Sequence, residues 1–433
     1  MKRLLWFAAS LVGLIALAVG GLFLAAPTVR LYYSTKADIE TRLYFSDIDN
    51  ELEGLIFSTE EVVAGFERTG VVTSANDNSG RLFVVELSGS VYIVQDGERQ
   101  AEPFLALPSE RLYNDGQPVG YGENGLLDLA FHADFAENGR FFISYVNADN
   151  RLAISELRVD EEDTNRADLA TEQVLLTVPR PANAHLHYGG ALIADENGHL
   201  YIGVGDASGQ GDHQTDAQDP NTLSGSILRI DVERPATDEA LYAIPAENPF
   251  VDSLAGAPEV WAYGVRNPWR MALSPDGRQI YVTDVGAGKW EEINILDTDE
   301  EGHNLGWAFY EGPNRYERSY PSEVRAATFY SNEAPENLVF PVGGYEHLGG
   351  NCAVIGGAFV TLPTRQSQES SFLYGDYCSG RIWLMWPHDG EWQQEIVLDS
   401  EVRMTSMSRG EDGRIYMTDL GGKLHRLVIE ETS

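Results

Sequence analysis

Basic residues are scarce in this sequence. Of its 433 residues, 30 are Lys or Arg and 67 are Asp or Glu, which gives a formal net charge of -37. Proteins that bind nucleic acid neutralise phosphates with a surplus of Lys and Arg. The charge balance therefore argues against nucleic acid as a partner, and also against adsorption to an anionic lipid surface.

Cysteine is almost absent, with Cys352 and Cys378 as the only two. No C-x-x-C motif occurs, so neither thioredoxin-like redox chemistry nor a zinc ribbon is indicated. In an oxidising compartment, two cysteines 26 positions apart (378 − 352) are consistent with one disulfide. Two unrelated buried thiols are the alternative.

Several catalytic signatures are also missing. The chain contains no G-x-S-x-G nucleophile elbow, no H-E-x-x-H zinc helix and no phosphate-binding G-x-x-x-x-G-K-[ST]. These absences argue against serine hydrolases, zinc proteases and P-loop enzymes.

The N-terminal segment has the longest apolar run. Lys2 and Arg3 precede an uncharged stretch from position 4 to position 26, which is 23 residues, and about 20 suffice to cross a bilayer. We expect residues 1–27 to form a signal anchor with its positive end in the cytoplasm. A cleavable signal peptide is the alternative, with Ala16-Leu17-Ala18 as a small-residue cleavage site. Both predict a periplasmic or extracytoplasmic protein, with residues 28–58 as a membrane-proximal spacer.

After this segment, a short turn ending in glycine recurs before a short apolar strand. Such Asn-Gly and Asp-Gly turns connect antiparallel strands into hairpins. The turns end at Gly80, Gly139, Gly198, Gly277 and Gly413. The spacing allows six units of roughly 60 residues. We therefore predict an all-β fold for residues 59–433, a six-bladed β-propeller of four-stranded antiparallel sheets; an array of β-sandwiches is the alternative.

Three windows carry side chains suited to chemistry. In Ala184-His185-Leu186-His187, a histidine could act as a general base, or the two could bind a metal, or both could be ordinary loop residues. The loop from Gly205 to Asp212 carries Asp206 and other oxygen side chains, which suit a calcium site or a polar turn equally. In Arg266-Asn267-Pro268-Trp269-Arg270, the two arginines suit a planar carboxylate, or salt bridges between blades.

Together these windows resemble the glucose/sorbosone dehydrogenase family, the soluble PQQ (pyrroloquinoline quinone)-dependent aldose sugar dehydrogenases, over roughly residues 58–428. The resemblance implies a six-bladed propeller that oxidises a sugar. The motifs that carry it are Gly122-Glu123-Asn124-Gly125-Leu126-Leu127, Ala130-Phe131-His132, His187-Tyr188-Gly189-Gly190, Leu200-Tyr201-Ile202-Gly203-Val204-Gly205-Asp206, Gly264-Val265-Arg266-Asn267-Pro268, Asp284-Val285-Gly286, Trp290-Glu291-Glu292-Ile293, Asn304-Leu305-Gly306-Trp307 and Gly375-Asp376-Tyr377-Cys378-Ser379-Gly380-Arg381-Ile382.

The resemblance implies catalytic roles for three residues. His187 matches the base that takes a proton from the anomeric hydroxyl of a sugar while hydride passes to PQQ. Glu123 matches a polar residue near substrate and cofactor. Arg266 matches the residue that stabilises the negative oxygen of the reduced quinone, and Asn267 matches its neighbour on PQQ.

The resemblance also implies a calcium ion, held by the backbone carbonyls of Gly286 and Ala287. Glu292 matches a carboxylate at an additional calcium site, and Tyr345 and His347 lie in a loop that supplies walls of the pocket. The substrate would be a small sugar, and the electron acceptor is unidentified.

The chain departs from the family in its cationic residues. Where glucose-oxidising members place a Lys, this chain has Cys378-Ser379-Gly380, and only Arg403 remains of an Arg-x-Arg pair. Arg381 and Arg270 are the residues that would compensate. Members similar to hedgehog-interacting protein bind partners without quinone chemistry. The alternatives to the dehydrogenase are therefore a non-catalytic carbohydrate- or protein-binding propeller and a calcium-dependent lactonase that uses His187 with Asp206.

Overall fold

The computed structural model describes Leu52 and residues 54–432, apart from positions 115, 117, 182–183, 208–215, 234–239, 301, 317–333, 336 and 363–370. The expected anchor and most of the expected spacer lie outside these residues. Within the described part of the chain, no helix is both long and apolar enough to cross a membrane.

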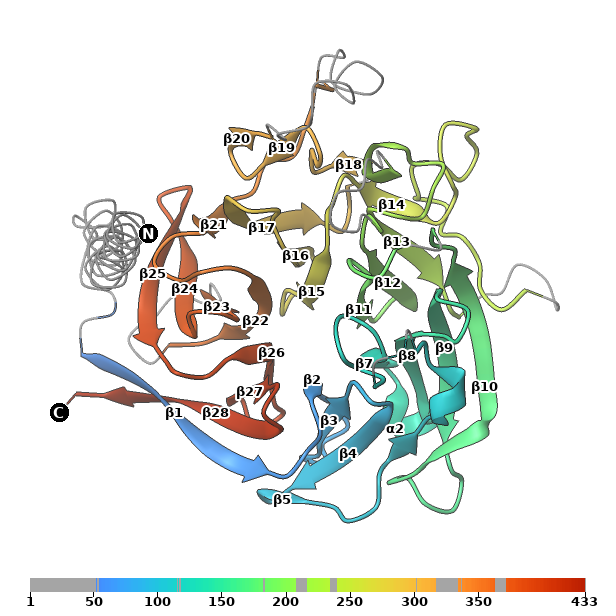
Figure 1. The fold of residues 1–433 in the computed structure, drawn as a ribbon, viewed down its shortest axis with the longest axis vertical. Helices are drawn as coiled ribbons and strands as arrows, with labels where there is room; N and C mark the ends of the chain where they lie inside the picture. The colour runs from blue at the N-terminus through green and yellow to red at the C-terminus, as the bar shows by residue number, and fades with distance from the viewer. Residues whose placement is uncertain are drawn as a thin grey trace, which may run out of the picture.

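The described residues form six antiparallel sheets arranged in a ring around a central axis, as predicted (Figure 1). Blades 1 to 3 follow one another along the chain. They contain β2 (Thr69–Ser74), β3 (Leu82–Glu86), β4 (Ser90–Gln95), β5 (Glu98–Arg99) and β6 (Leu105–Ala106); β7 (Leu126–Phe131), β8 (Arg140–Val146), β9 (Leu152–Val159) and β10 (Ala167–Val178); and β11 (Gly189–Ala194), β12 (His199–Val204), β13 (Ser226–Asp231) and β14 (Val260–Tyr263).

Blades 4 to 6 complete the ring. They contain β15 (Pro268–Leu273), β16 (Gln279–Asp284), β17 (Trp290–Asp297) and β21 (Gly343–Glu346); β22 (Val354–Val360), β23 (Ser371–Asp376), β24 (Arg381–His388) and β25 (Glu391–Asp399); and β26 (Met404–Arg409), β27 (Ile415–Asp419), β28 (Lys423–Glu431) and β1 (Leu55–Ala64).

A few short elements lie outside the four-strand pattern. The strand β18 (His303–Asn304) pairs in parallel with β14, and β19 (Tyr310–Glu311) forms a separate hairpin with β20 (Asn314–Arg315). The short helical turns are η1 (Ser109–Arg111), α2 (Phe135–Asn138) and η2 (Asp216–Gln218).

The ring closes by pairing the two ends of the described chain. Strand β1 is the outermost strand of blade 6, where Leu55 lies opposite Glu431 and Ala64 opposite Lys423. This strand begins before position 59, where we expected the propeller to start. Closure of this kind joins the two ends of the described chain in one sheet, so a ladder of backbone hydrogen bonds holds the ring closed.

The recurring glycine turns connect the first and second strands of five blades. Gly80, Gly139, Gly198, Gly277 and Gly413 all have positive φ angles, between 64° and 82°. This conformation favours glycine because it has no Cβ, and it explains why a glycine ends the turn in these five hairpins.

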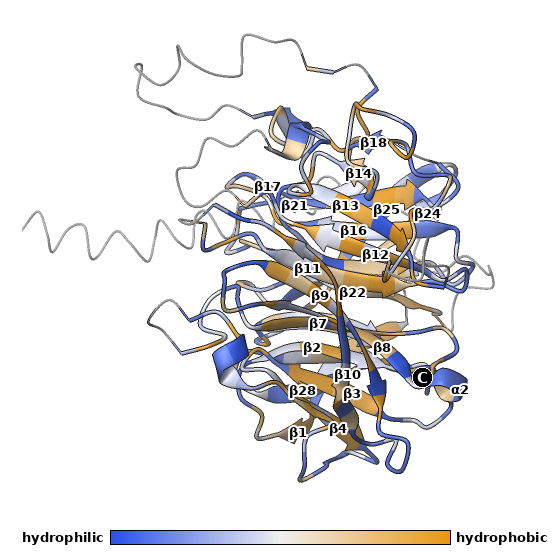
Figure 2. Cartoon of the chain, turned by 90° about the vertical axis from the view of Figure 1, so that its right-hand side faces the viewer, coloured by the Kyte–Doolittle hydropathy of each residue, from blue (hydrophilic) through white to orange (hydrophobic). Residues whose placement is uncertain are grey.

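The innermost strand of each blade contacts the innermost strands of the two neighbouring blades, in the order β2, β7, β11, β15, β22 and β26. Apolar side chains fill the space between the blades; Phe83, Phe104 and Phe141, for example, are at most 1% exposed between blades 1 and 2. Figure 2 shows the strands to be largely apolar and the connecting loops largely hydrophilic.

The predicted disulfide between Cys352 and Cys378 is present, with the two Cα atoms 5.6 Å apart. It connects the segment before β22 to the β23–β24 turn in blade 5. Asp376 supports the same corner, because its carboxylate accepts hydrogen bonds from the backbone N–H groups of both cysteines.

Candidate functional site

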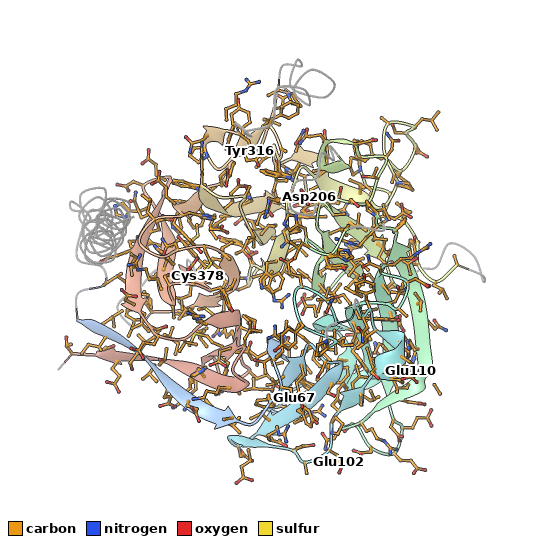
Figure 3. All side chains as sticks on the ribbon, viewed as in Figure 1. Glu67, Glu102, Glu110, Asp206, Tyr316 and Cys378 are labelled. Carbon is orange, nitrogen blue, oxygen red and sulfur yellow. A yellow bond between two sulfur atoms is a disulfide. The ribbon has the colours of Figure 1, made fainter. Side chains whose placement is uncertain are left out.

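The predicted base, His187, lies just before β11, where the chain enters blade 3. Its ring Nδ1 is 2.7 Å from Oδ1 of Asp206, which follows β12. The second oxygen of Asp206 accepts a hydrogen bond of 2.8 Å from Nε1 of Trp307. His187 is 7% exposed and Asp206 1% exposed. Asp206, labelled in Figure 3, therefore fixes the orientation of the imidazole from a buried position.

Two more predicted residues lie against His187. The carboxylate of Glu123 accepts a 2.7 Å hydrogen bond from the backbone N–H of His187, and a longer one of 3.3 Å from the side-chain amide of Asn267. The carbonyl oxygen of Asn267 in turn accepts from the backbone N–H of Gly189. Glu123, His187 and Asn267 come from blades 2, 3 and 4, so only the closed ring assembles them.

Arg266 completes this group. Its backbone carbonyl accepts a hydrogen bond from the backbone N–H of Asp206, and its guanidinium donates to the carbonyl of Val285. The guanidinium carbon lies 5.6 Å from the centre of the Trp307 ring. Arg266 therefore places a partly exposed positive charge beside the His187 and Asp206 pair.

Asp284, which we did not predict as a site residue, holds the Arg266–Asn267 segment in place. Its two carboxylate oxygens accept hydrogen bonds from the backbone N–H groups of Arg266 and Asn267. Burial raises the pKa of Asp284. Burial, together with the charge of Asp284, also raises the pKa of Glu292, which lies opposite it on β17.

The loop from Val285 to Lys289, between β16 and β17, contains the carbonyls expected to bind calcium. Four consecutive backbone N–H groups, from Ala287 to Trp290, donate to a single carboxylate oxygen of Glu311, at 2.7 to 3.2 Å. In a planar trans peptide, the C=O points away from the N–H. The carbonyls of Gly286 and Ala287 therefore face away from Glu311.

This arrangement fits a hard cation. Carbonyl and carboxylate oxygens are the ligands that Ca²⁺ prefers, and a cation near Glu292 would offset the cost of burying two carboxyl groups close together. Among the described side chains, no three His, Cys, Asp or Glu residues converge as a metal cluster. The expected calcium set differs from such a cluster because it depends mainly on backbone oxygens.

The two predicted pocket residues Tyr345 and His347 contact other side chains rather than His187. The Tyr345 hydroxyl donates to Asp376, and its ring stacks on Trp383 with centroids 4.3 Å apart. His347 pairs with Glu291, whose other oxygen accepts the backbone N–H of Gly286. His347 is therefore connected to the loop through Glu291.

Of the other cationic residues that we predicted for the site, Arg381 and Arg270 make contacts outside the His187 group. Arg381 donates to Asn351 and lies 3.7 Å from Asp399, and Arg403 is exposed. Arg270 is buried on β15, the innermost strand of blade 4, where it donates to the backbone carbonyls of Trp269 and Gly70. Compensation for the missing Lys and Arg by Arg381 and Arg270 stays a prediction.

The structure also describes the two histidines considered as a metal pair, His185 and His187, and part of the loop from Gly205 to Asp212. His185 is exposed and lies 3.2 Å from the Tyr113 hydroxyl, so the two histidines contact different partners. Much of the loop from Gly205 to Asp212 lies outside the described residues, but the carboxylate of Asp206 is engaged by His187 and Trp307.

A sequence profile of the glucose/sorbosone dehydrogenases matches residues 71–426. The chain belongs to this family. Human hedgehog-interacting protein is 31% identical over 83% of this chain and 52% of its own length. Aldose sugar dehydrogenase YliI of Escherichia coli is 30% identical over 53% of this chain and 56% of its own.

The fold also matches that of a solved structure. The PQQ-bound aldose sugar dehydrogenase from Streptomyces coelicolor has a TM-score of 0.64 and 18% identity, with 86% of this chain and 98% of that chain covered. The chain spans about half the length of the first curated relatives that it matches.

Proposed function

We propose that this protein is a PQQ- and calcium-dependent dehydrogenase that oxidises an aldose at C1 to its lactone. The observation that carries this proposal is the buried hydrogen bond between His187 and Asp206. Arg266 lies beside this pair and donates to Val285, the first residue of the loop expected to bind calcium. We further propose that the protein acts outside the cytoplasm, held by an N-terminal anchor or released after cleavage, and passes its electrons to an unidentified acceptor.

His187 serves as the general base. An ionised carboxylate accepts but does not donate, so Nδ1 of His187 carries the proton that bonds to Asp206. The ring then offers Nε2 as the acceptor for the proton of the anomeric hydroxyl. Asp206 stabilises the positive charge that His187 gains when it takes this proton.

Glu123 accepts a hydrogen bond from the backbone N–H of His187, and Asn267 accepts one from the backbone N–H of Gly189. Together they fix the backbone that carries the His187 ring. The carbonyls of Gly286 and Ala287 would hold Ca²⁺, with Glu292 at an additional calcium site. Arg266 and Asn267 would hold PQQ, whose quinone carbonyl, polarised by the metal, supplies the hydride acceptor when bound.

An activity assay on the purified full-length protein tests this proposal. With PQQ and Ca²⁺ added, we expect aldose-dependent reduction of a redox dye, and His187→Ala should lower kcat about 1,000-fold, within the range for loss of a general base. Absence of any PQQ absorbance change at micromolar protein would contradict the proposal. Undiminished activity of His187→Ala would refute the assigned base alone.

A non-catalytic binding propeller is the second candidate. The engagement of Arg381 by Asn351 and Asp399 favours it, because a trianionic cofactor needs cations around it. The similarity to hedgehog-interacting protein, which is named for an interaction, points the same way. Binding of an immobilised glycan or protein without any quinone binding would support this candidate.

A further inference from the structure

His187 has an unusual backbone conformation. Its φ angle is +57°, in the left-handed region that residues with a side chain rarely adopt. Gly189 and Gly190, which follow closely, have φ angles of +65° and +93°. Strained backbone of this kind persists only where the surrounding structure holds it, and it concentrates at functional sites.

The conformation directs the His187 carbonyl into a narrow space. A Cβ atom at Gly205 would lie only 2.1 Å from that carbonyl oxygen, so only glycine fits there. At the other end of the residue, the carboxylate of Glu123 accepts a hydrogen bond from the backbone N–H of His187. The backbone of His187 is therefore held from several directions.

Arg180, in the segment between β10 and β11, makes the most extensive of these contacts. Its guanidinium donates to the backbone carbonyl of His187 at 2.9 Å and to that of Leu186. The guanidinium carbon also lies 3.8 Å from the centre of the Tyr188 ring. One side chain thus contacts three consecutive residues, with His187 in the middle.

We propose that Arg180 is a positioning residue that holds His187 in the left-handed conformation and thereby keeps its imidazole on Asp206. This inference rests on the proposed role of His187 as base. The planar guanidinium is suited to the task because its fixed donors reach two carbonyls at once while its face stacks on an aromatic ring. A lysine ammonium is a single point charge without a stacking face, so it can replace only part of this contact.

Two substitutions test the proposal, Arg180→Gln and Arg180→Lys, with Arg158→Gln as the matched control. Arg158 is exposed on blade 2 and donates to the carbonyl of Asn138, away from His187. Thermal unfolding first establishes that each variant folds. Crystal structures then give the φ angle of His187 and the distance from its Nδ1 to Asp206, and steady-state kinetics of the protein loaded with PQQ and Ca²⁺ give kcat and KM separately.

In Arg180→Gln, we expect His187 to return to a negative φ angle and its Nδ1 to move beyond about 3.5 Å from Asp206. We expect kcat to fall about 100-fold, the scale reported for small misplacements of a catalytic group, with KM changed little. Arg180→Lys should recover part of the loss, and Arg158→Gln should match the unmodified protein.

Retention of the positive φ angle and of the Asp206 hydrogen bond in folded Arg180→Gln would overturn the proposal. If Arg180→Gln does not fold, the same measurements on Arg180→Lys decide the question. If the unmodified protein oxidises no aldose, the proposed function fails, but the φ angle and the distance in the variants still decide the role of Arg180.

Discussion

Asp206 accepts hydrogen bonds from two ring N–H groups at once, Nδ1 of His187 and Nε1 of Trp307, one at each carboxylate oxygen. A carboxylate can accept both, whereas an amide has only one acceptor oxygen. Both carboxylate oxygens of Asp206 are therefore engaged in holding the two rings.

This relationship predicts the effect of Asp206→Asn. The amide NH2 would face either His187 or Trp307, so one ring N–H would lose its acceptor and the imidazole would rotate or change tautomer. We expect kcat for aldose oxidation to fall by about 100-fold or more, the scale of general base catalysis, as measured by dye reduction.

Asp195→Asn is the matched control for this substitution. Asp195 also pairs with a histidine in blade 3, His199, at 3.1 Å, but it lies at the other end of β12. It should leave kcat within about twofold of the unmodified protein, because Asp195 bonds to Asn197 and His199 at the end of β12 away from His187. Equal losses in both variants would contradict the special role of Asp206.

The loop at Gly286 predicts a dependence on calcium and on Glu311. A chelator should abolish activity and added Ca²⁺ should restore it. Glu311→Gln removes the charge that orients four N–H groups of the loop, and we expect Ca²⁺ affinity to fall about tenfold, as for other groups that orient metal ligands. Isothermal titration of the PQQ-free protein measures this affinity without reference to activity.

Glu346→Gln, an exposed residue on β21, serves as the control for Glu311→Gln. Activity that survives a strong chelator would count against the calcium site, whatever the effect of Glu311.

Arg270 predicts a stability effect without a direct catalytic one. Its guanidinium reaches from blade 4 to the carbonyl of Gly70 in blade 1 and lies 4.0 Å from Asp128 in blade 2. Both side chains are buried, so Arg270→Gln leaves Asp128 as an uncompensated buried charge. We expect a loss of about 3 kcal/mol in the free energy of unfolding, measured by urea titration.

The double substitution Arg270→Gln, Asp128→Asn should recover part of this loss, because it removes the unpaired charge. A double loss equal to the sum of the two single losses would show that the two residues do not interact.

The carboxyl group of Asp419, on β27 in blade 6, predicts a pH dependence of stability. Burial opposes ionisation of Asp419, but the hydrogen bonds from His425 and from the backbone of Lys423 outweigh it, so the pKa of this carboxyl is lowered. A lowered pKa stabilises the fold above the ordinary value of 3.8, and this stabilisation is lost as the pH falls through the folded-state pKa.

We therefore expect Asp419→Asn to destabilise the protein by about 1 kcal/mol at pH 7, and by progressively less below pH 4. Unfolding by urea over a series of pH values measures this difference. A destabilisation that stays constant down to pH 2 would mean that the ionised carboxylate is not what stabilises the blade.

The repeated glycine turns and the family resemblance together predicted the propeller. Each hairpin is a local structure, and its turn glycine, such as Gly198 or Gly277, has a positive φ angle. The disulfide between Cys352 and Cys378 also followed from the sequence, because the chain offers one possible pair. The contacts of Arg381 and Arg270 did not follow from the sequence, since the partner of a long flexible cation depends on distant segments.

The sequence by itself determined the strand pattern, the acidic surface and the motifs that place His187, Arg266 and Asn267 near strand ends. Only the tertiary structure showed that Arg180 and Trp307 act on His187 and Asp206, and that Glu311 orients the loop at Gly286. The physical reason is that these contacts join residues that are not adjacent in the chain. Local patterns fix the backbone of each blade, whereas closure of the ring decides which side chains meet.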